Sequence, residues 1–183
     1  EGTTTATVQA NTTAGFSIVK YAGNSSSRTV GHGLDSAPEW VIVKSLTDAE
    51  RFVIFHTSIS DQYIYLNETF AGATGNADER FGDSSSVVVP NSTVVTLGAN
   101  NSDVNENGDN YIMYCFHSVD GYSKFGKYVG NSSADGAYVH LGFAPAWVLI
   151  KNSDTADDNW YLADNKRDPS SNRNPITQII NPN

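Results

Sequence analysis

One stretch of this sequence repeats an earlier stretch, and the repeat constrains the fold more than any single residue does. Residues 15–44 and residues 121–151 share the same order of Gly-aromatic-Ser, Tyr, Gly-Asn-Ser-Ser and Ala-Pro-x-Trp followed by an apolar run ending in Lys. The residues that recur 107 positions later are Tyr21, Asn24, Pro38, Trp40 and Lys44, matched by Tyr128, Asn131, Pro145, Trp147 and Lys151. Such an internal duplication indicates that one structural unit is used twice.

The repeat also predicts how the chain is divided. We expect residues 1–14, which are small and polar, to form an extended lead-in or linker. Residues 15–120 then form a first β-rich repeat, and residues 121–183 form a second, truncated one. The second repeat lacks a counterpart of residues 63–117. We expect it to pack with the first in one sandwich.

The composition between these landmarks favours strands. Charged residues make up 17% of the chain, and the apolar positions are mostly β-branched or aromatic, in short runs bounded by Gly, Asn, Pro or Ser. The pattern predicts an all-β fold, an antiparallel β-sandwich resembling a jelly roll, without an amphipathic helix of ten residues or more. The expected strands are residues 15–21, 29–34, 40–44, 52–56, 63–66, 86–89, 94–97, 111–117, 147–151 and 160–162, with a hairpin after each Trp-containing strand.

Charge and cysteine content exclude several classes of function. The formal net charge is −9 and the basic residues are scattered, which argues against a nucleic-acid partner. No window of about 18 apolar residues is present, so we predict no membrane span. The single cysteine, Cys115, lies in a run that is apolar on both faces, and we expect a buried, unreactive thiol. Stability must then come from packing or from oligomerisation.

One acidic stretch offers a candidate metal site. Asp103, Asn105 and Asn107 precede Gly108 in the order of the first half of a calcium loop, although Tyr114 stands where such a loop has its final Glu. Asn-Gly is also the preferred centre of a type I′ hairpin turn. Both interpretations stay open here, and calcium is the one cofactor that the sequence suggests.

Catalytic patterns are missing from the sequence. There is no Gly-x-Ser-x-Gly nucleophile elbow and no glycine-rich phosphate loop. Acidic pairs such as Asp48 with Glu50, and Asp157 with Asp158, fall in expected turns, where solvated carboxylates are ordinary. His32 and His140 occupy near-equivalent places in the two copies, which indicates a structural role. We therefore predict that the chain is not an enzyme and has no catalytic residues.

Aromatic side chains remain as candidates for ligand binding, because sugar rings stack on exposed aromatic rings. Trp40 and Trp147 lie in strands that are apolar on both faces, and we expect both to be core anchors. The candidates for a ligand-binding surface are Tyr128, Tyr138, Trp160 and Tyr161.

The second copy, GYSKFGKYVGNSSADGAYVHLGFAPAWVLIK followed by Lys166, Arg167, Asp168 and Pro169, resembles a repeated β-rich domain of tail-fibre and appendage proteins of tailed bacteriophages. The first copy carries the signature in a looser form. The resemblance implies a component of the virion surface, outside the cell, with a sandwich or jelly-roll fold and a homo-oligomeric state in which a trimer is favoured. It implies no catalytic residues.

These observations favour a non-enzymatic bacteriophage structural protein, a domain of a tail fibre, spike or capsid appendage. Its expected partners are copies of itself, other virion proteins and a host-surface glycan. Two alternatives stay open: a polysaccharide depolymerase carried on a fibre, and a structural module of a bacterial extracellular fibre or adhesin.

Overall fold

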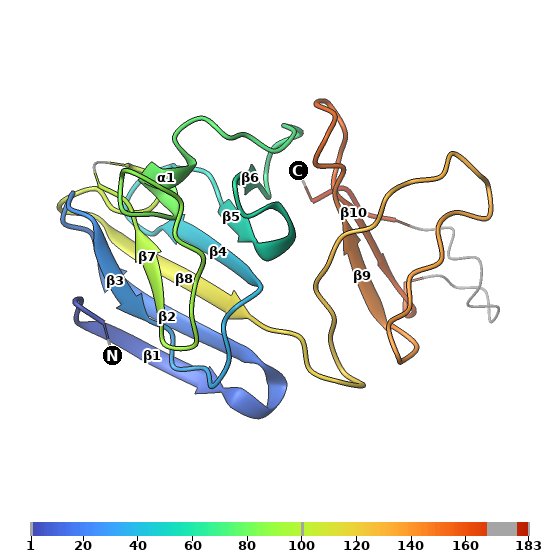
Figure 1. Cartoon of the computed structure of the whole chain (residues 1–183), viewed down its shortest axis with the longest axis horizontal. Helices are drawn as coiled ribbons and strands as arrows, with labels where there is room; N and C mark the ends of the chain where they lie inside the picture. Colours follow the sequence, from blue (N-terminus) through green and yellow to red (C-terminus); the bar gives the residue numbers. More distant parts are fainter. Residues whose placement is uncertain (1, 100, 168–178, 183) are drawn as a thin grey trace.

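β4 (Trp40–Ser45) is apolar on both faces because it lies in the middle of a sheet that carries a packed layer on each side. The computed structural model describes residues 2–99, 101–167 and 179–182, and in it this strand pairs antiparallel with β8 (Asn110–Phe116) and β5 (Val53–His56). The sheet has six strands in the order β1-β2-β8-β4-β5-β6 (Figure 1). The remaining members are β1 (Ala6–Asn11), β2 (Phe16–Ala22) and β6 (Ile64–Tyr65).

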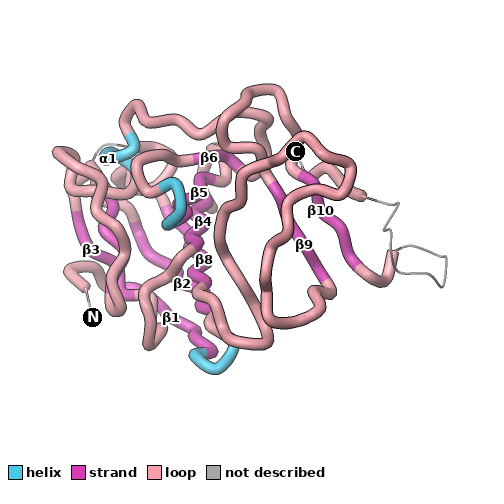
Figure 2. The backbone as a smooth tube through the Cα atoms, turned by 45° about the vertical axis from the view of Figure 1, so that its right-hand side comes forward, coloured by secondary structure: helices cyan, strands magenta, loops and turns pink. Residues whose placement is uncertain are grey.

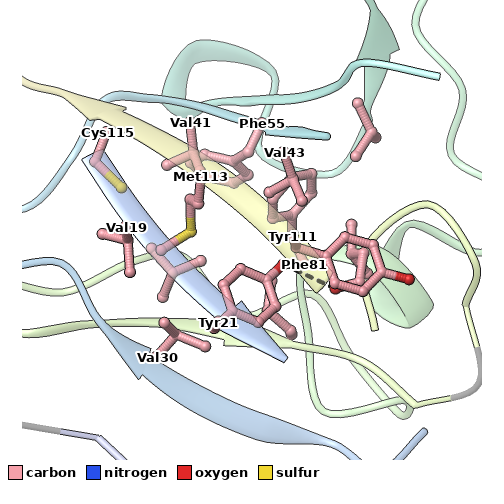
Figure 3. Close-up of a cluster of buried hydrophobic side chains, with 14 of the residues drawn as sticks. Val19, Tyr21, Val30, Val41, Val43, Phe55, Phe81, Tyr111, Met113 and Cys115 are labelled. Carbon is pink, nitrogen blue, oxygen red and sulfur yellow. Dashed lines mark hydrogen bonds between the residues drawn. The ribbon is translucent and has the colours of Figure 1, made fainter. Parts of the chain in front are cut away.

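A smaller second layer covers one face of this sheet. β3 (Arg28–Gly31) and β7 (Val94–Leu97) form an antiparallel pair. The layer between them and the large sheet is the main core, which includes Val19, Tyr21, Val41, Val43, Phe55, Phe81, Tyr111, Met113 and Cys115, all exposed by 2% or less (Figure 3). The all-β antiparallel sandwich predicted from the sequence is therefore confirmed, as is the burial of the cysteine.

The opposite face of the large sheet carries a second apolar cluster. Trp40, Ile42, Ile54 and Ile64 lie on this face, and Trp160 packs against them from the C-terminal part of the chain. That part contributes the antiparallel hairpin of β9 (Trp147–Ile150) and β10 (Tyr161–Asp164). Figure 2 shows the long loop segment that joins β8 to this hairpin. Both predicted hairpins after a Trp-containing strand are thus present.

Three short helical segments complete the described chain. They are η1 (Thr12–Ala14), η2 (Thr57–Ile59) and α1 (Ala77–Arg80). All three are shorter than ten residues, which agrees, for the described residues, with the expectation that long amphipathic helices are missing. None is long and apolar enough to cross a membrane.

Two predicted features are wrong. The N-terminal segment contains β1, which pairs with β2 from Ala6–Tyr21 to Asn11–Phe16, so only its first few residues resemble a lead-in. Small polar residues obscured this strand because it lies at the sheet edge with most of its side chains exposed. Residues 86–89 are not a strand either, since only Val87 makes a bridge, to Gly82.

The Asn107-Gly108 step is a turn but not a hairpin. Gly108 has a φ of +96° and Asn107 is not among the residues with positive φ, whereas a type I′ turn requires positive φ at both. The flanking strands β7 and β8 belong to different sheets. Asn-Gly serves here as a connection between layers.

Candidate binding surface

The duplicated segments share their local backbone geometry. Ser25 and Ser132, which are equivalent in the repeat, have φ values of +58° and +55°, although serine rarely adopts positive φ. In each copy the preceding Asn side chain accepts a hydrogen bond from the backbone N–H two residues on, at 3.0 Å for Asn24 and 3.1 Å for Asn131. The hydrogen bond that defines this turn joins neighbouring residues, so the same short sequence forms it in both places, although the first copy also bonds to Asn105.

The burial of the two copies differs sharply. Tyr21 is 2% exposed and its equivalent Tyr128 is 50% exposed, while Trp40 is 9% exposed and Trp147 is 50% exposed. The prediction that both tryptophans are core anchors is therefore right for Trp40 and wrong for Trp147. Trp40 stacks on Phe116 of the neighbouring β8. β9 pairs with β10 only, so among the described strands it has no neighbour on its other edge that could shelter Trp147.

The structure excludes Trp160 as a candidate ligand-binding residue. Its side chain is 4% exposed in the second apolar cluster, and its indole Nε1–H donates a hydrogen bond to the carbonyl oxygen of Tyr65 at 2.8 Å. A buried indole that has found its acceptor is a packing anchor. It holds the C-terminal hairpin against β6, and it cannot stack on a ligand in solvent.

The other three candidates are exposed, but they do not form one group. Tyr138 is 88% exposed and its hydroxyl lies 3.2 Å from Nδ1 of His140, within the irregular loop that also contains Tyr128. Tyr161, 42% exposed, lies on β10 instead. His140 is itself exposed, so the structural role expected for both histidines holds only for the buried His32.

The loop between β8 and β9 has the chemistry of a sugar-binding surface. Tyr122, Tyr128 and Tyr138 are 65%, 50% and 88% exposed. Asn131 and Asp135 are exposed in the same loop, and the Asn131 side chain donates to the Gly136 carbonyl oxygen at 2.6 Å, which closes the turn around them. Flat aromatic rings with amide and carboxylate groups nearby can stack on sugar rings and bond their hydroxyls. We call residues 121–146 the aromatic loop.

The C-terminal hairpin presents a second exposed surface. Leu149 packs with Trp160 on the second apolar cluster, so its strand neighbours Val148 and Ile150 point to the other side. Ile150 is opposite Tyr161 on β10, and these two side chains are 38% and 42% exposed. We call the surface made by Val148, Ile150, Tyr161 and Ala163 the open face.

In the first copy the equivalent surface is the core. Val41 and Val43 occupy the positions of Val148 and Ile150, and both are 0% exposed beneath β3 and β7. Val53, opposite Val43 as Tyr161 is opposite Ile150, is also 0% exposed. The open face is thus a core surface that lacks the covering layer in the described residues. Sequence pattern alone misses it, because the pattern of the two strands is the same.

The calcium candidates have other partners in the fold. Oδ2 of Asp103 lies 2.7 Å from an Arg80 guanidinium nitrogen and accepts from the Tyr65 hydroxyl at 3.1 Å. Oδ1 of Asn105 accepts from the Asn24 backbone N–H at 3.1 Å, and Asn107 is exposed. The described residues contain no group of three His, Cys, Asp or Glu side chains that could hold a metal ion. Calcium binding stays a prediction without support from this geometry.

Asp158 and Asp164, two acidic residues of the C-terminal part of the chain, make local hydrogen bonds. Oδ2 of Asp158 accepts from the Asn152 side chain at 2.6 Å. Both oxygens of Asp164 are bonded, Oδ1 to the backbone N–H groups of Lys166 and Arg167 and Oδ2 to Arg167 Nε at 2.9 Å. These hydrogen bonds from Lys166 and Arg167 lower the pKa of Asp164. Asp168 and Pro169 of the Lys-Arg-Asp-Pro motif lie outside the described residues.

Two shallow depressions flank η1, and the sequence did not indicate them. One is lined by Asn11, Thr13, Ala14, Val119 and Tyr122, and the other by Gln9, Ala10, Asn11, Thr12, Phe16 and Ile18. The first brings Tyr122 of the aromatic loop next to the β1–β2 turn. Amide and hydroxyl groups at this turn therefore extend the polar surroundings of Tyr122.

Comparison with known proteins gives a single family. No curated protein and no solved structure matches the chain. The family described as a domain of unknown function (DUF7483) matches across residues 1–183, and the chain therefore belongs to that family.

Proposed function

We propose that this chain is a non-enzymatic structural protein of a bacteriophage particle, a domain of a tail fibre, spike or capsid appendage that binds host-surface glycan. The observation that carries the proposal is the contrast in burial between the two copies. The same strand pattern is covered in the first copy, with Val43 at 0% and Trp40 at 9% exposure, and is less covered in the second, where their equivalents Ile150 and Trp147 are 38% and 50% exposed.

Such a contrast is typical of a module that assembles. Folding of the first unit supplies a stable sandwich, and apolar surface left on the second unit lowers the free energy when it is covered by another molecule. The assembly is a homo-oligomer, and three copies is the number that the resemblance to fibre proteins favours. The resemblance also supports placement on a phage particle: the repeated Tyr-x-Gly-Asn motif and the Pro-x-Trp-Val-Leu-Ile-Lys motif of the second copy resemble those of phage appendage domains.

Glycan binding is assigned to the aromatic loop. Tyr128 and Tyr138 are its exposed rings, and Asn131 and Asp135 supply hydrogen-bonding groups. A loop held by its own hydrogen bonds on a rigid sandwich can be replaced without changing the scaffold, which is how binding sites on receptor-recognition modules are usually arranged.

The location is tested by immunogold labelling. Antibody raised against the purified chain is applied to particles from a culture that encodes it, and the expected result is label on a tail or capsid appendage. Preimmune serum is the control. Label that is confined to cell-surface fibres contradicts the virion assignment and favours the bacterial fibre or adhesin module.

The ligand is tested separately on a glycan array. We expect the wild-type chain to bind host-surface polysaccharide and the Tyr138→Ala variant to bind at least about fivefold more weakly, because a lost stacking contact removes about 1 kcal/mol or more. Phe70→Ala is the matched control, since Phe70 is 53% exposed outside the loop. Equal binding by both variants contradicts the assignment to the aromatic loop.

A further inference from the structure

The covering layer of the first unit shows what a core face of this pattern requires. Val41 and Val43 of β4 and Val53 of β5 are covered by Val30 of β3 and by Val95 and Leu97 of β7, all at 0% exposure. The C-terminal hairpin repeats β4 and β5 but has no counterpart of β3 and β7 in the described residues. Its open face therefore resembles one side of a hydrophobic core, without the second layer that would complete the core in the described residues.

The charge distribution limits what can cover this face. Each molecule of this chain carries a formal net charge of −9, so two molecules repel one another electrostatically. Val148, Ile150, Tyr161 and Ala163 include no charged side chain. This is a surface on which two copies can meet without bringing carboxylates together. A basic partner, by contrast, would find no acidic residue on the face to pair with.

The geometry of the hairpin also suits a partner of the same kind. Alternate residues of β9 point to opposite sides, with Leu149 packed on the molecule's own second cluster. The side chains of the opposite side are free to contact another molecule. An identical face supplies aliphatic groups like those that the first unit draws from its own β3 and β7, and it needs no component other than the chain itself.

We propose that the open face is the surface by which molecules of this chain assemble, with Val148, Ile150 and Tyr161 of neighbouring molecules packed together around the symmetry axis of the oligomer. This inference rests on the proposed function, since it names the contact of the proposed homo-oligomer. The inference goes beyond that function because it assigns the contact to the C-terminal hairpin and leaves the aromatic loop free for ligand.

Site-specific cross-linking tests the contact. The only cysteine of the chain, Cys115, is 0% exposed and burial raises the pKa of its thiol to about 12, so it does not react with a maleimide in the folded protein. We expect Tyr161→Cys to be joined between copies by a short bis-maleimide. Tyr138→Cys is the control, because Tyr138 is 88% exposed and lies in the aromatic loop. It is expected to react singly with little cross-linking.

A second variant tests the energy of the same contact. Ile150→Asp places a carboxylate on the face, and we expect the dissociation constant of the oligomer, measured by light scattering after size exclusion, to rise at least about a hundredfold. Val139→Asp is the control, since Val139 is 46% exposed in the aromatic loop. Unchanged circular dichroism confirms that both variants fold. If Ile150→Asp does not fold, the cross-linking result decides.

The outcomes separate this inference from the function on which it rests. An oligomer in which Tyr161→Cys is not cross-linked, or in which Val139→Asp dissociates as readily as Ile150→Asp, overturns the open face as the contact. A wild-type chain that stays monomeric at high concentration overturns it as well. Neither result affects the immunogold test, so a chain found on the particle but joined through another surface leaves the virion assignment standing.

Discussion

His32 is the histidine that the fold holds most completely. Its side chain is 0% exposed, Nδ1 accepts from the Leu34 backbone N–H at 3.1 Å, and Nε2 lies 3.0 Å from the Asn91 carbonyl oxygen. An Nδ1 that accepts leaves the proton on Nε2, so both contacts are satisfied by the neutral ring. Burial lowers the pKa of His32 below its usual value of about 6.5. Folding therefore favours the neutral form.

This histidine predicts how stability depends on pH. The unfolded chain takes up the proton first as pH falls, so the stabilising contribution is complete above about pH 6.5 and is lost toward the lower pKa of the folded protein. We expect a smaller free energy of unfolding at pH 5.5 than at pH 7.5, measured by urea denaturation. His32→Gln is expected to weaken that dependence, and His140→Gln, at an exposed site, to preserve it. Burial also lowers the pKa of His56, so we expect His56 to contribute part of the pH dependence that remains in the His32→Gln variant. A flat wild-type profile over this range contradicts the prediction.

The Arg80–Asp103 pair is the second residue-scale feature. The two side chains are 11% and 4% exposed and meet at 2.7 Å, with the Tyr65 hydroxyl bonded to both. Breaking a buried pair leaves an uncompensated charge, so we expect Arg80→Met to lower the free energy of unfolding by about 3–5 kcal/mol. Arg51→Met is the matched control, because the Arg51–Glu68 pair is 45% and 30% exposed. It is expected to cost about 1 kcal/mol or less.

Equal losses of unfolding free energy in Arg80→Met and Arg51→Met would contradict the prediction, because the expected difference comes from the burial of the Arg80–Asp103 pair. Thermal and urea denaturation at neutral pH give both values. The same measurement with added calcium tests the metal prediction, since a calcium ion bound to the folded protein would raise the free energy of unfolding.

At the scale of elements, β4 and β9 carry nearly the same residues in different surroundings. β4 has β8 on one edge and β5 on the other, and a layer on each face. β9 has β10 on one edge, and its Val148 and Ile150 side is open. A strand's contribution to stability comes mainly from cross-strand and cross-layer packing, so the two elements should differ greatly in it.

Parallel substitutions test that difference. We expect Trp40→Ala to lower the free energy of unfolding by about 3–5 kcal/mol, because it empties a buried, stacked site. Trp147→Ala is expected to cost about 1 kcal/mol or less, since half of its side chain is already exposed. Chemical denaturation of both variants beside the wild type measures this. Similar losses would show that the two copies are packed alike, contrary to the structure.

The whole molecule is a covered sandwich with an exposed C-terminal hairpin attached to the outer face of its large sheet. Trp160 and Leu149 make the attachment to that sheet, and Lys151 Nζ adds a hydrogen bond to the carbonyl oxygen of Thr69. The attachment uses one side of the hairpin and leaves the other side free. The formal net charge of −9 is therefore segregated from the open face, whose four side chains are uncharged.

This segregation predicts the effect of salt on assembly. Copies of like charge repel, and ions screen that repulsion, while contact between apolar faces is not weakened by salt. We expect the dissociation constant of the oligomer to fall as sodium chloride is raised from about 0.05 M to about 0.5 M. Light scattering after size exclusion measures this, with Ile150→Asp as the control that stays dissociated. Dissociation on adding salt would indicate an ionic contact and contradict the open face.

Much of the strand order could be predicted, and the errors have physical causes. The strands with bulky apolar residues between turn residues, such as β2, β4 and β8, lie where their patterns place them. β1 was missed because an exposed edge strand needs few apolar side chains. Trp147 and Trp160 were assigned the wrong way round, because a pattern specifies which faces of a strand are apolar and not whether another element covers them.

The sequence by itself determined the features that close within a few residues. The turns at Ser25 and Ser132 have the same positive φ and the same Asn hydrogen bond, because each is made by adjacent residues. Tertiary structure alone decided burial, because β4 finds its partner β8 about seventy residues further along and β9 finds no equivalent in the described chain. One motif therefore forms a core in the first copy and an exposed, uncharged face in the second.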